Sequence, residues 1–262
     1  MISRMDLTKR SALLWVVTLA SFGVIGAANG SIASDSDRAR AIQADLTARE
    51  DGKFDQLLKR WEGRYGTKAV PPLLKIASDR RQNDADRYVA LMGAARLGGT
   101  DVAPVIAHYL SDRSWMIRSG ALRALRALGH PETGPAVLPL LRDPALVVRS
   151  EAVETIEKLR PAGSEEALIS VLEHGANYHS GKAQWVPQKA LKALVTLKAS
   201  SAAPRLRPLL KHERDPKLQA ETVATLEALT GRTVKKGAPL AERIRAWETS
   251  FDSAPQRAPA SN

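Results

Sequence analysis

The chain of 262 residues contains no cysteine, and only 5% of its residues are aromatic. Without cysteine it forms no disulfide framework, no iron–sulfur cluster and no thiolate-based zinc or catalytic site. Because aromatic side chains are few, alanine and leucine supply most of the core. This palette is typical of tightly packed helices and not of sheets rich in valine, isoleucine and aromatics, so the composition favours an all-α protein.

Motifs for catalysis are missing as well. The chain has no glycine-rich phosphate loop, no nucleophile elbow and no His-Glu-x-x-His pair. His174 and His179 stand near Glu173, but Gly175 and Gly181 interrupt any helix that would bring them to one face. We therefore expect no metal site, no cofactor and no enzymatic activity.

Residues 1–33 have the pattern of an export signal. Arg4, Lys9 and Arg10 form a positive start, an apolar run extends from Leu13 to about Ala28, and small residues follow. The run is near the lower limit for a membrane span. We predict a cleaved signal peptide, with an uncleaved anchor as the alternative. Both place the protein beyond the cytoplasmic membrane, either periplasmic or secreted, or tethered to that membrane.

Three further segments flank or follow the centre of the chain. Residues 34–66 are charged and amphipathic, with a break near residues 51–52, and predict an N-terminal helical cap. Residues 232–251 predict a C-terminal capping helix that begins at about residue 240. Residues 252–262 are rich in alanine, proline and serine and predict a disordered tail.

An internal repeat is the strongest signal in the chain. A shift of 31 residues places Ala90 on Ala121 and Ala121 on Ala152, and two later units around Ala190 and Thr222 keep the pattern after an insertion. Each unit predicts two helices joined by a polar turn, the second with an apolar stripe at i, i+1, i+4 and i+7. One hairpin cannot bury this stripe alone, so residues 67–231 predict about five stacked hairpins in a right-handed α-solenoid.

Residues 143–153 (DPALVVRSEAV), with their counterpart at 112–122, resemble the HEAT-repeat family, specifically the short bacterial repeats of the phycobilisome-lyase type. The resemblance extends over residues 67–231. It implies an interaction scaffold whose second helices line a concave surface, and it implies no particular activity. The similar di-iron deoxyhypusine hydroxylases use several His-Glu dipeptides, whereas this chain has one, His212-Glu213, which cannot assemble such a centre.

A ladder of aspartates and arginines recurs at the repeat spacing: Asp112, Arg118, Asp143 and Arg149, with Arg87 one unit earlier. The arginines suit a basic stripe for phosphates or carboxylates. The resemblance implies instead that these pairs are structural. We therefore expect the preceding Asp112 and Asp143 to accept hydrogen bonds from these arginines and from turn amides, which would lock hairpin to hairpin.

The exposed side of the second helices is the surface most available to a partner. Its charges change sign and no aromatic side chain is interleaved, whereas a nucleic acid needs a continuous basic groove. We predict ion pairs between neighbouring repeats, no nucleic-acid partner, and Arg123, Arg126 and Lys192 as candidate contacts to a protein. The two rows on this side are Met92, Arg123, Glu154, Lys192 and Ala224, and then Ala95, Arg126, Glu157, Val195 and Glu227.

The insertion at residues 175–181 interrupts the fourth unit. Insertions in solenoids lie on one face and often bind partners. Tyr178, His179 and Trp185 are amphipathic side chains of the kind that interfaces use. The alternative is a flexible turn with Trp185 in the core.

The function that the sequence favours is a non-enzymatic, exported scaffold that binds another protein through the concave face or the insertion. Its formal charge of +11 suits an acidic partner and a weak contact with the membrane surface. Two alternatives stay open. One is an accessory protein of the lyase or chaperone type that binds a tetrapyrrole or similar ligand. The other is a DNA-binding protein, which export and the mixed charges disfavour.

Overall fold

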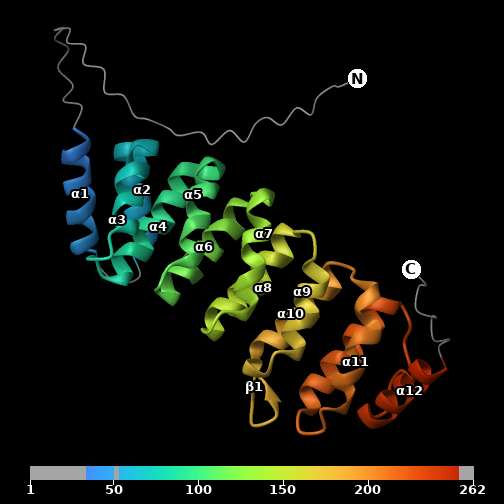
Figure 1. Cartoon of the computed structure of the whole chain (residues 1–262). Coiled ribbons are helices and arrows are strands. Elements are labelled where there is room, and N and C mark those ends of the chain that lie inside the picture. Colours follow the sequence, from blue (N-terminus) through green and yellow to red (C-terminus); the bar gives the residue numbers. More distant parts are fainter. Residues whose placement is uncertain (1–33, 50–52, 254–262) are drawn as a thin grey trace, which may run out of the picture. The chain divides into compact units, whose positions relative to one another are not determined.

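The computed structural model describes residues 34–49 and 53–253. The predicted export signal and all but the first two residues of the predicted tail lie outside the described residues. Within them the chain is helical except for one short β-hairpin, and Figure 1 shows helical pairs that follow one another in sequence order. The prediction of an all-α solenoid is confirmed.

Five helical hairpins form the centre of the described chain. Short 3₁₀ turns lie at Gly66–Ala69, Gly99–Val102, Pro131–Thr133 and Gly175–Asn177. The first helices are α3 (Val70–Ser78), α5 (Ala103–Ala107) with the 3₁₀ segment His108–Ser111, α7 (Gly134–Val137) with the 3₁₀ segment Leu138–Arg142, α9 (Ser164–Glu173), and the 3₁₀ segment η7 (Ser200–Lys211). The second helices are α4 (Asp84–Gly98), α6 (Trp115–Leu128), α8 (Leu146–Leu159), α10 (Trp185–Thr196) and α11 (Pro216–Thr230).

The apolar stripe of the second helices builds the core. Ala90, Ala121, Ala152 and Ala190 are fully buried, and each is followed by a buried Leu or Val. Small side chains at this position let neighbouring backbones approach, so α4 packs on α6, α6 on α8, α8 on α10 and α10 on α11. The stretch Asp84–Ser111 is long and apolar enough to cross a membrane, but here it forms α4 and the next first helix within the stack.

Proline makes the first helices short or irregular. Pro104 and Pro135 lie in the opening turns of α5 and α7, where no amide donor is needed. Pro204 and Pro208 lie inside η7, which keeps 3₁₀ geometry over its whole length. A proline inside a helix removes one amide donor and crowds the preceding turn, so η7 does not become an α-helix.

Two helices, α1 (Asp35–Thr47) and α2 (Phe54–Tyr65), precede the first hairpin. Ser34 and Asp37 form a reciprocal capping box at the start of α1. Trp61 of α2 is fully buried, and its indole Nε1 donates to Asp45 Oδ2 at 3.0 Å. A Cβ atom at Gly93 of α4 would lie 2.9 Å from the Trp61 ring, so glycine permits α2 to seat closely on α4.

The last helix, α12 (Leu240–Asp252), packs on α11 and η7 and buries Trp247. Asp252 was expected to begin the disordered tail. This expectation is wrong for Asp252, because the residue completes α12 and accepts from Arg207 Nη2 at 2.5 Å.

Candidate functional site

The arginine and aspartate ladder joins each hairpin to the next one along the chain. Arg118 donates from Nε and Nη2 to the two carboxylate oxygens of Asp143, at 2.6 and 2.8 Å. Arg87 donates from Nη1 and Nη2 to the two carboxylate oxygens of Asp112 in the following unit, at 3.4 and 2.5 Å. Arg118 also binds the backbone carbonyl of Asp112 in its own turn at 2.9 Å. Arg118 therefore binds both the turn of its own unit and the carboxylate of the next unit.

The carboxylates of the ladder are held by turn amides as well. Asp112 accepts from the Ser114 amide, and Asp143 accepts from the Ala145 amide, both at 2.8 Å. Burial alone would raise the pKa of Asp112, but the hydrogen bonds from Arg87 and from the Ser114 amide hold that pKa below its ordinary value. The two carboxylates of the ladder are thus occupied by hydrogen bonds from arginines and turn amides.

In the fourth unit, an asparagine takes the place of the aspartate. The buried Arg149 donates from Nε to Asn177 Oδ1 at 2.7 Å and from Nη1 to the Asp143 carbonyl at 2.7 Å. The next link is the amide of Ala183, which donates to Asp215 Oδ2 at 2.7 Å. Sequence reasoning missed Asn177 because the insertion moves it out of the 31-residue register. The ladder therefore runs through the insertion.

The insertion itself is a β-hairpin of β1 (Tyr178–His179) and β2 (Lys182–Ala183). Ser180 and Gly181, with φ of +51° and +76°, make the tight turn between the strands. The Tyr178 hydroxyl donates to the Leu172 carbonyl at 2.6 Å, and its ring stacks on His212. Burial raises the pKa of Tyr178 to about 12, and the charge of Asp215 adds to the shift.

The three residues predicted for the insertion are placed differently from one another. Tyr178 is held against the body of the fourth and fifth units, whereas His179 is exposed at the hairpin. Trp185 is the first residue of α10 and is 48% exposed. The alternative in which Trp185 enters the core is therefore wrong, because the helix start turns this side chain away from the buried face formed by Val186 and Ala190.

Ion pairs occupy the middle of the second-helix rows. Arg126 donates to Glu151 at 2.8 Å and to Glu154 at 2.5 Å, and Lys189 also binds Glu154. Arg123 lies 3.7 Å from Glu151. Burial would raise the pKa of Glu154, but the bond from Lys189 and the charge of Arg126 lower it. These charges join α6, α8 and α10 and satisfy one another.

Lys192 lies on the exposed side of α10, and no ion pair to it is found in the described part of the chain. The three residues predicted to contact a protein partner therefore differ in their surroundings. Arg123 and Arg126 belong to the ion-pair network, whereas Lys192 stands beside it.

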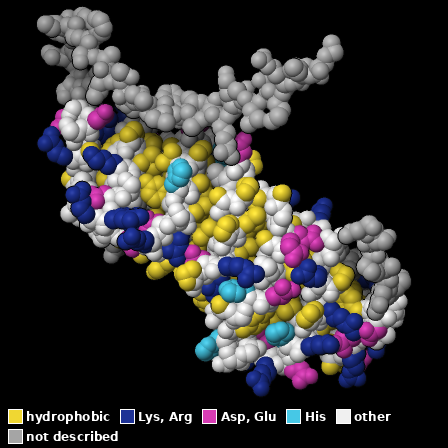
Figure 2. Space-filling view, viewed as in Figure 1, with side chains coloured by type: hydrophobic (Ala, Val, Ile, Leu, Met, Phe, Trp, Pro, Cys, Tyr) yellow, Lys and Arg dark blue, Asp and Glu magenta, His cyan; other side chains and the backbone are white. Residues whose placement is uncertain are grey.

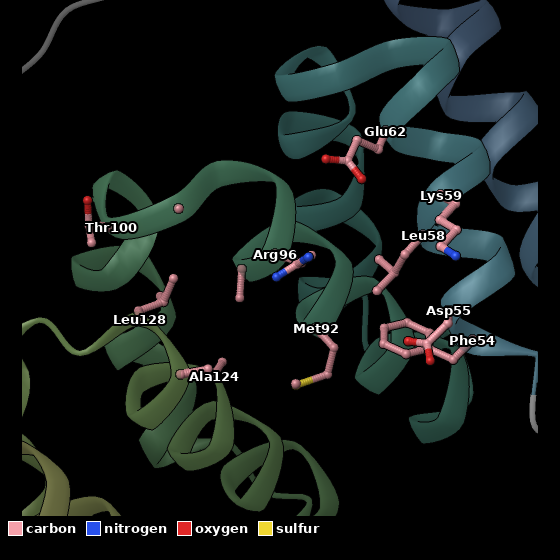
Figure 3. A pocket seen from close by; sticks show the side chains of 13 residues that line it. Phe54, Asp55, Leu58, Lys59, Glu62, Met92, Arg96, Thr100, Ala124 and Leu128 are labelled. Atoms are coloured by element: carbon pink, nitrogen blue, oxygen red, sulfur yellow. The ribbon is translucent and has the colours of Figure 1, made fainter.

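A groove of about 780 Å³ lies at the N-terminal end of these rows, between α2, α4 and α6. Figure 3 shows Phe54 and Leu58 from α2 on one side and Leu128 from α6 on the other, with Met92 from α4 between them. All four apolar side chains are partly exposed. The floor is therefore apolar and accessible from solvent.

Charged side chains of both signs surround the floor of the groove. Asp55, Lys59 and Glu62 come from α2, and Arg96 comes from α4. All four are exposed, and no ion pair to any of them is found in the described part of the chain. The rim is thus available to charges of a partner, in contrast to the paired network on α6, α8 and α10.

Local sequence explains how the groove forms. Leu57 and Trp61, four residues apart, bury one stripe of α2, which leaves Phe54 and Leu58 on the adjacent side. Met92 and Ala95 are the first members of the two rows read from the repeat. These two apolar residues indicated an uncharged surface at this end of the rows. The sequence did not indicate which side of α2 faces them.

Comparisons with known proteins agree with the repeat. Residues 70–157, from α3 to α8, match the family model described as HEAT repeats. A search of the curated proteins gives no match. An engineered protein of known structure is 16% identical, with 77% of this chain and 93% of that chain covered and a TM-score of 0.45.

Two further solved structures are designed armadillo repeat proteins. One, in complex with the peptide (KR)4, is 18% identical, with 73% of this chain and 99% of that chain covered and a TM-score of 0.46. The other has the same identity and coverage and a TM-score of 0.43. At these TM-scores the likenesses carry no weight for function. The five hairpins make the described chain an all-α solenoid, and residues 70–157 of this solenoid match the HEAT-repeat model.

Proposed function

We propose that this protein is a non-enzymatic scaffold that binds a segment of another protein in the groove between α2, α4 and α6. The observation that carries the proposal is the open apolar floor of Phe54, Leu58, Met92 and Leu128 in a volume of about 780 Å³. Interfaces gain most of their affinity from a few anchor side chains that fill such desolvated pockets. By contrast, Arg123 and Arg126, two other candidate contacts, are engaged in the ion-pair network of α6, α8 and α10.

The groove indicates the chemistry of the partner. Its floor accepts one or two apolar anchor side chains, which a helical segment would present at i and i+3 or i+4. Its rim offers Lys59 and Arg96 to acidic groups and Asp55 and Glu62 to basic groups. The favoured ligand is therefore an amphipathic segment with charges of both signs, and not a purely acidic one. The mixed rim also suits a peptide better than a nucleic acid.

Replacing Met92 by lysine should lower the affinity for such a segment at least about tenfold, because an ammonium group would enter the apolar floor. Ligands are selected from a displayed library of random 12-residue peptides on the immobilised full chain. Their affinities are then measured by titration calorimetry for the natural chain and for Met92→Lys.

The matched control is Val105→Lys, which makes the same kind of change at an exposed apolar residue of α5 outside the groove. This variant should bind selected peptides with unchanged affinity. Selected peptides that bind Met92→Lys and the natural chain equally well would remove the groove from the proposed function.

Export is the second part of the proposed function, and the charge and apolar pattern of residues 1–33 supports it. Alkaline phosphatase fused after residue 33 should be active, since this reporter folds only outside the cytoplasm. A fusion with Arg4, Lys9 and Arg10 changed to glutamate should lose most of that activity. An inactive fusion to the natural segment would place the scaffold in the cytoplasm.

A further inference from the structure

The turns between the first and second helices of the hairpins collect basic side chains. At least one exposed cation stands in or beside this turn in each of the five units, and no ion pair to these side chains is found in the described part of the chain. We call this set the basic edge. Its members are Arg80, Arg113, Arg142, Lys182, Lys211 and Arg214.

Most acidic side chains near the basic edge form ion pairs with arginines. Asp79 binds Arg81 at 3.0 Å, Asp84 binds Arg87 at 3.1 Å, and Glu173 binds Arg205 at 3.1 Å. The two aspartates of the ladder bind arginines as described above. In the described part of the chain, two acids of this edge have no ion pair: the exposed Glu213, and the buried Asp215, which accepts from the amides of Ala183 and Leu218. The edge therefore keeps a clear positive excess.

Charges of the edge act on neighbouring units. Burial raises the pKa of Asp112 in the second unit, whereas the bonds from Arg87 and the Ser114 amide lower it. The charge of Arg80 in the first unit lowers it further. Burial lowers the pKa of His174 in the fourth unit, and the charges of Arg149 and Arg142 from the third lower it further. The charges of Arg80 and Arg142 therefore reach titratable groups of the next unit.

Exposed apolar side chains alternate with these cations. Trp115, Val147 and Trp185 are 48%, 40% and 48% exposed, and they lie at the first or second residue of α6, α8 and α10. Each follows a cation of the same turn by two to five residues. On the face drawn in Figure 2, Lys and Arg side chains together with Asp and Glu side chains surround exposed apolar patches. Three consecutive units thus repeat one cation and one large apolar side chain.

The opposite ends of the hairpins lack this pattern. There the exposed Lys158, Arg160 and Lys198 share the edge with Asp101 and Glu132, for which the described structure gives no ion pair either. The two edges therefore differ in charge although they belong to the same helices.

We propose that the basic edge docks on the surface of an anionic lipid bilayer. Tryptophan is the side chain that prefers the headgroup region of bilayers, and each nearby Lys or Arg adds attraction to anionic lipid. The basic edge suits a broad surface, because its exposed apolar side chains, Trp115, Val147 and Trp185, lie at the starts of successive helices. The groove of α2, α4 and α6 suits a peptide instead. If residues 1–33 stay attached as an uncleaved anchor, the alternative to a cleaved signal peptide, they would also hold the body near such a surface. The docking is independent of the groove.

The experiment compares two triple variants of the full chain that change the net charge equally. The edge variant is Arg113→Glu, Arg142→Glu and Lys182→Glu, and the control variant is Lys158→Glu, Arg160→Glu and Lys198→Glu. All chains carry Trp15→Phe, so that the N-terminal segment gives no tryptophan signal. Binding to vesicles of phosphatidylcholine, alone or with about one third phosphatidylglycerol, is measured by co-sedimentation, and brominated lipid serves as a fluorescence quencher.

The chain with the natural edge should bind the anionic vesicles more tightly than the neutral ones. In the edge variant, the ratio of the two affinities should fall at least roughly thirtyfold. The control variant should retain most of the gain. Brominated lipid should quench the fluorescence, and Trp115→Phe with Trp185→Phe should remove the quenched part, because Trp61 and Trp247 are buried.

Equal losses in the two triple variants would show that only net charge matters, and this would overturn the proposal. The proposal would also be overturned if brominated lipid left the tryptophan fluorescence unchanged while added polyglutamate changed it. The basic edge would then fit an acidic chain and not a bilayer. Vesicle binding that is the same with and without phosphatidylglycerol would overturn it too. In that case the N-terminal segment alone would hold the chain.

Discussion

Replacing Arg118 by alanine should lower the free energy of unfolding by about 3–5 kcal/mol, the usual cost of removing one partner of a buried ion pair. The carboxylate of Asp143 would stay buried between two repeats with the Ala145 amide as its remaining bond. The same change removes the hold of Arg118 on the Asp112 carbonyl. Urea denaturation followed by circular dichroism measures the loss.

Arg207→Ala is the matched control for this prediction. Arg207 also joins two elements through an aspartate, Asp252, but both side chains of this pair are solvent-accessible. Such surface pairs contribute less than about 1 kcal/mol. If both variants lost the same small amount of stability, the ladder would not lock hairpin to hairpin.

Replacing Trp61 by alanine should destabilise the N-terminal end of the stack by about 3–5 kcal/mol. The fully buried indole fills the space between α2 and α4 and binds Asp45, so its removal leaves a cavity and an unpaired carboxylate oxygen. Amide hydrogen exchange of α2 should become much faster. Peptide binding in the groove should be lost together with the protection of α2, because two of the four floor residues stand on this helix.

Trp185→Ala is the control for the second prediction. Its indole is 48% exposed at the start of α10, so truncation should cost less than about 1 kcal/mol and leave the exchange of α2 unchanged. Rapid exchange of α2 in both variants would mean that Trp61 does not anchor this helix.

The solenoid could be predicted from the sequence because its units repeat. Ala90, Ala121 and Ala152 recur at one spacing, and a position that repeats in this way must face the same neighbours in every unit. The ladder was readable for the same reason. The expected pairing of each arginine with the preceding aspartate is wrong, because Arg118 binds the carboxylate of Asp143 in the following unit. The sequence could not show this, since both directions fit the same register.

Features without a repeat were harder to predict. Asn177 replaces an aspartate of the ladder, but the insertion hides its register until the β-hairpin is seen. The groove depends on the angle at which α2 meets α4 and α6. A single amphipathic helix does not encode this angle in its own pattern, since the contact of Trp61 with Gly93 sets it.

A photocrosslink from the groove to a selected peptide tests the proposed binding site most directly. The photoreactive residue p-benzoylphenylalanine replaces Ala127, an exposed residue that lines the groove on α6, or it replaces Trp185 on α10. We predict that peptides selected on the natural chain crosslink to position 127 and not to position 185, and that Met92→Lys abolishes the crosslink. A crosslink from position 185 without one from position 127 would contradict the account and place binding at the insertion.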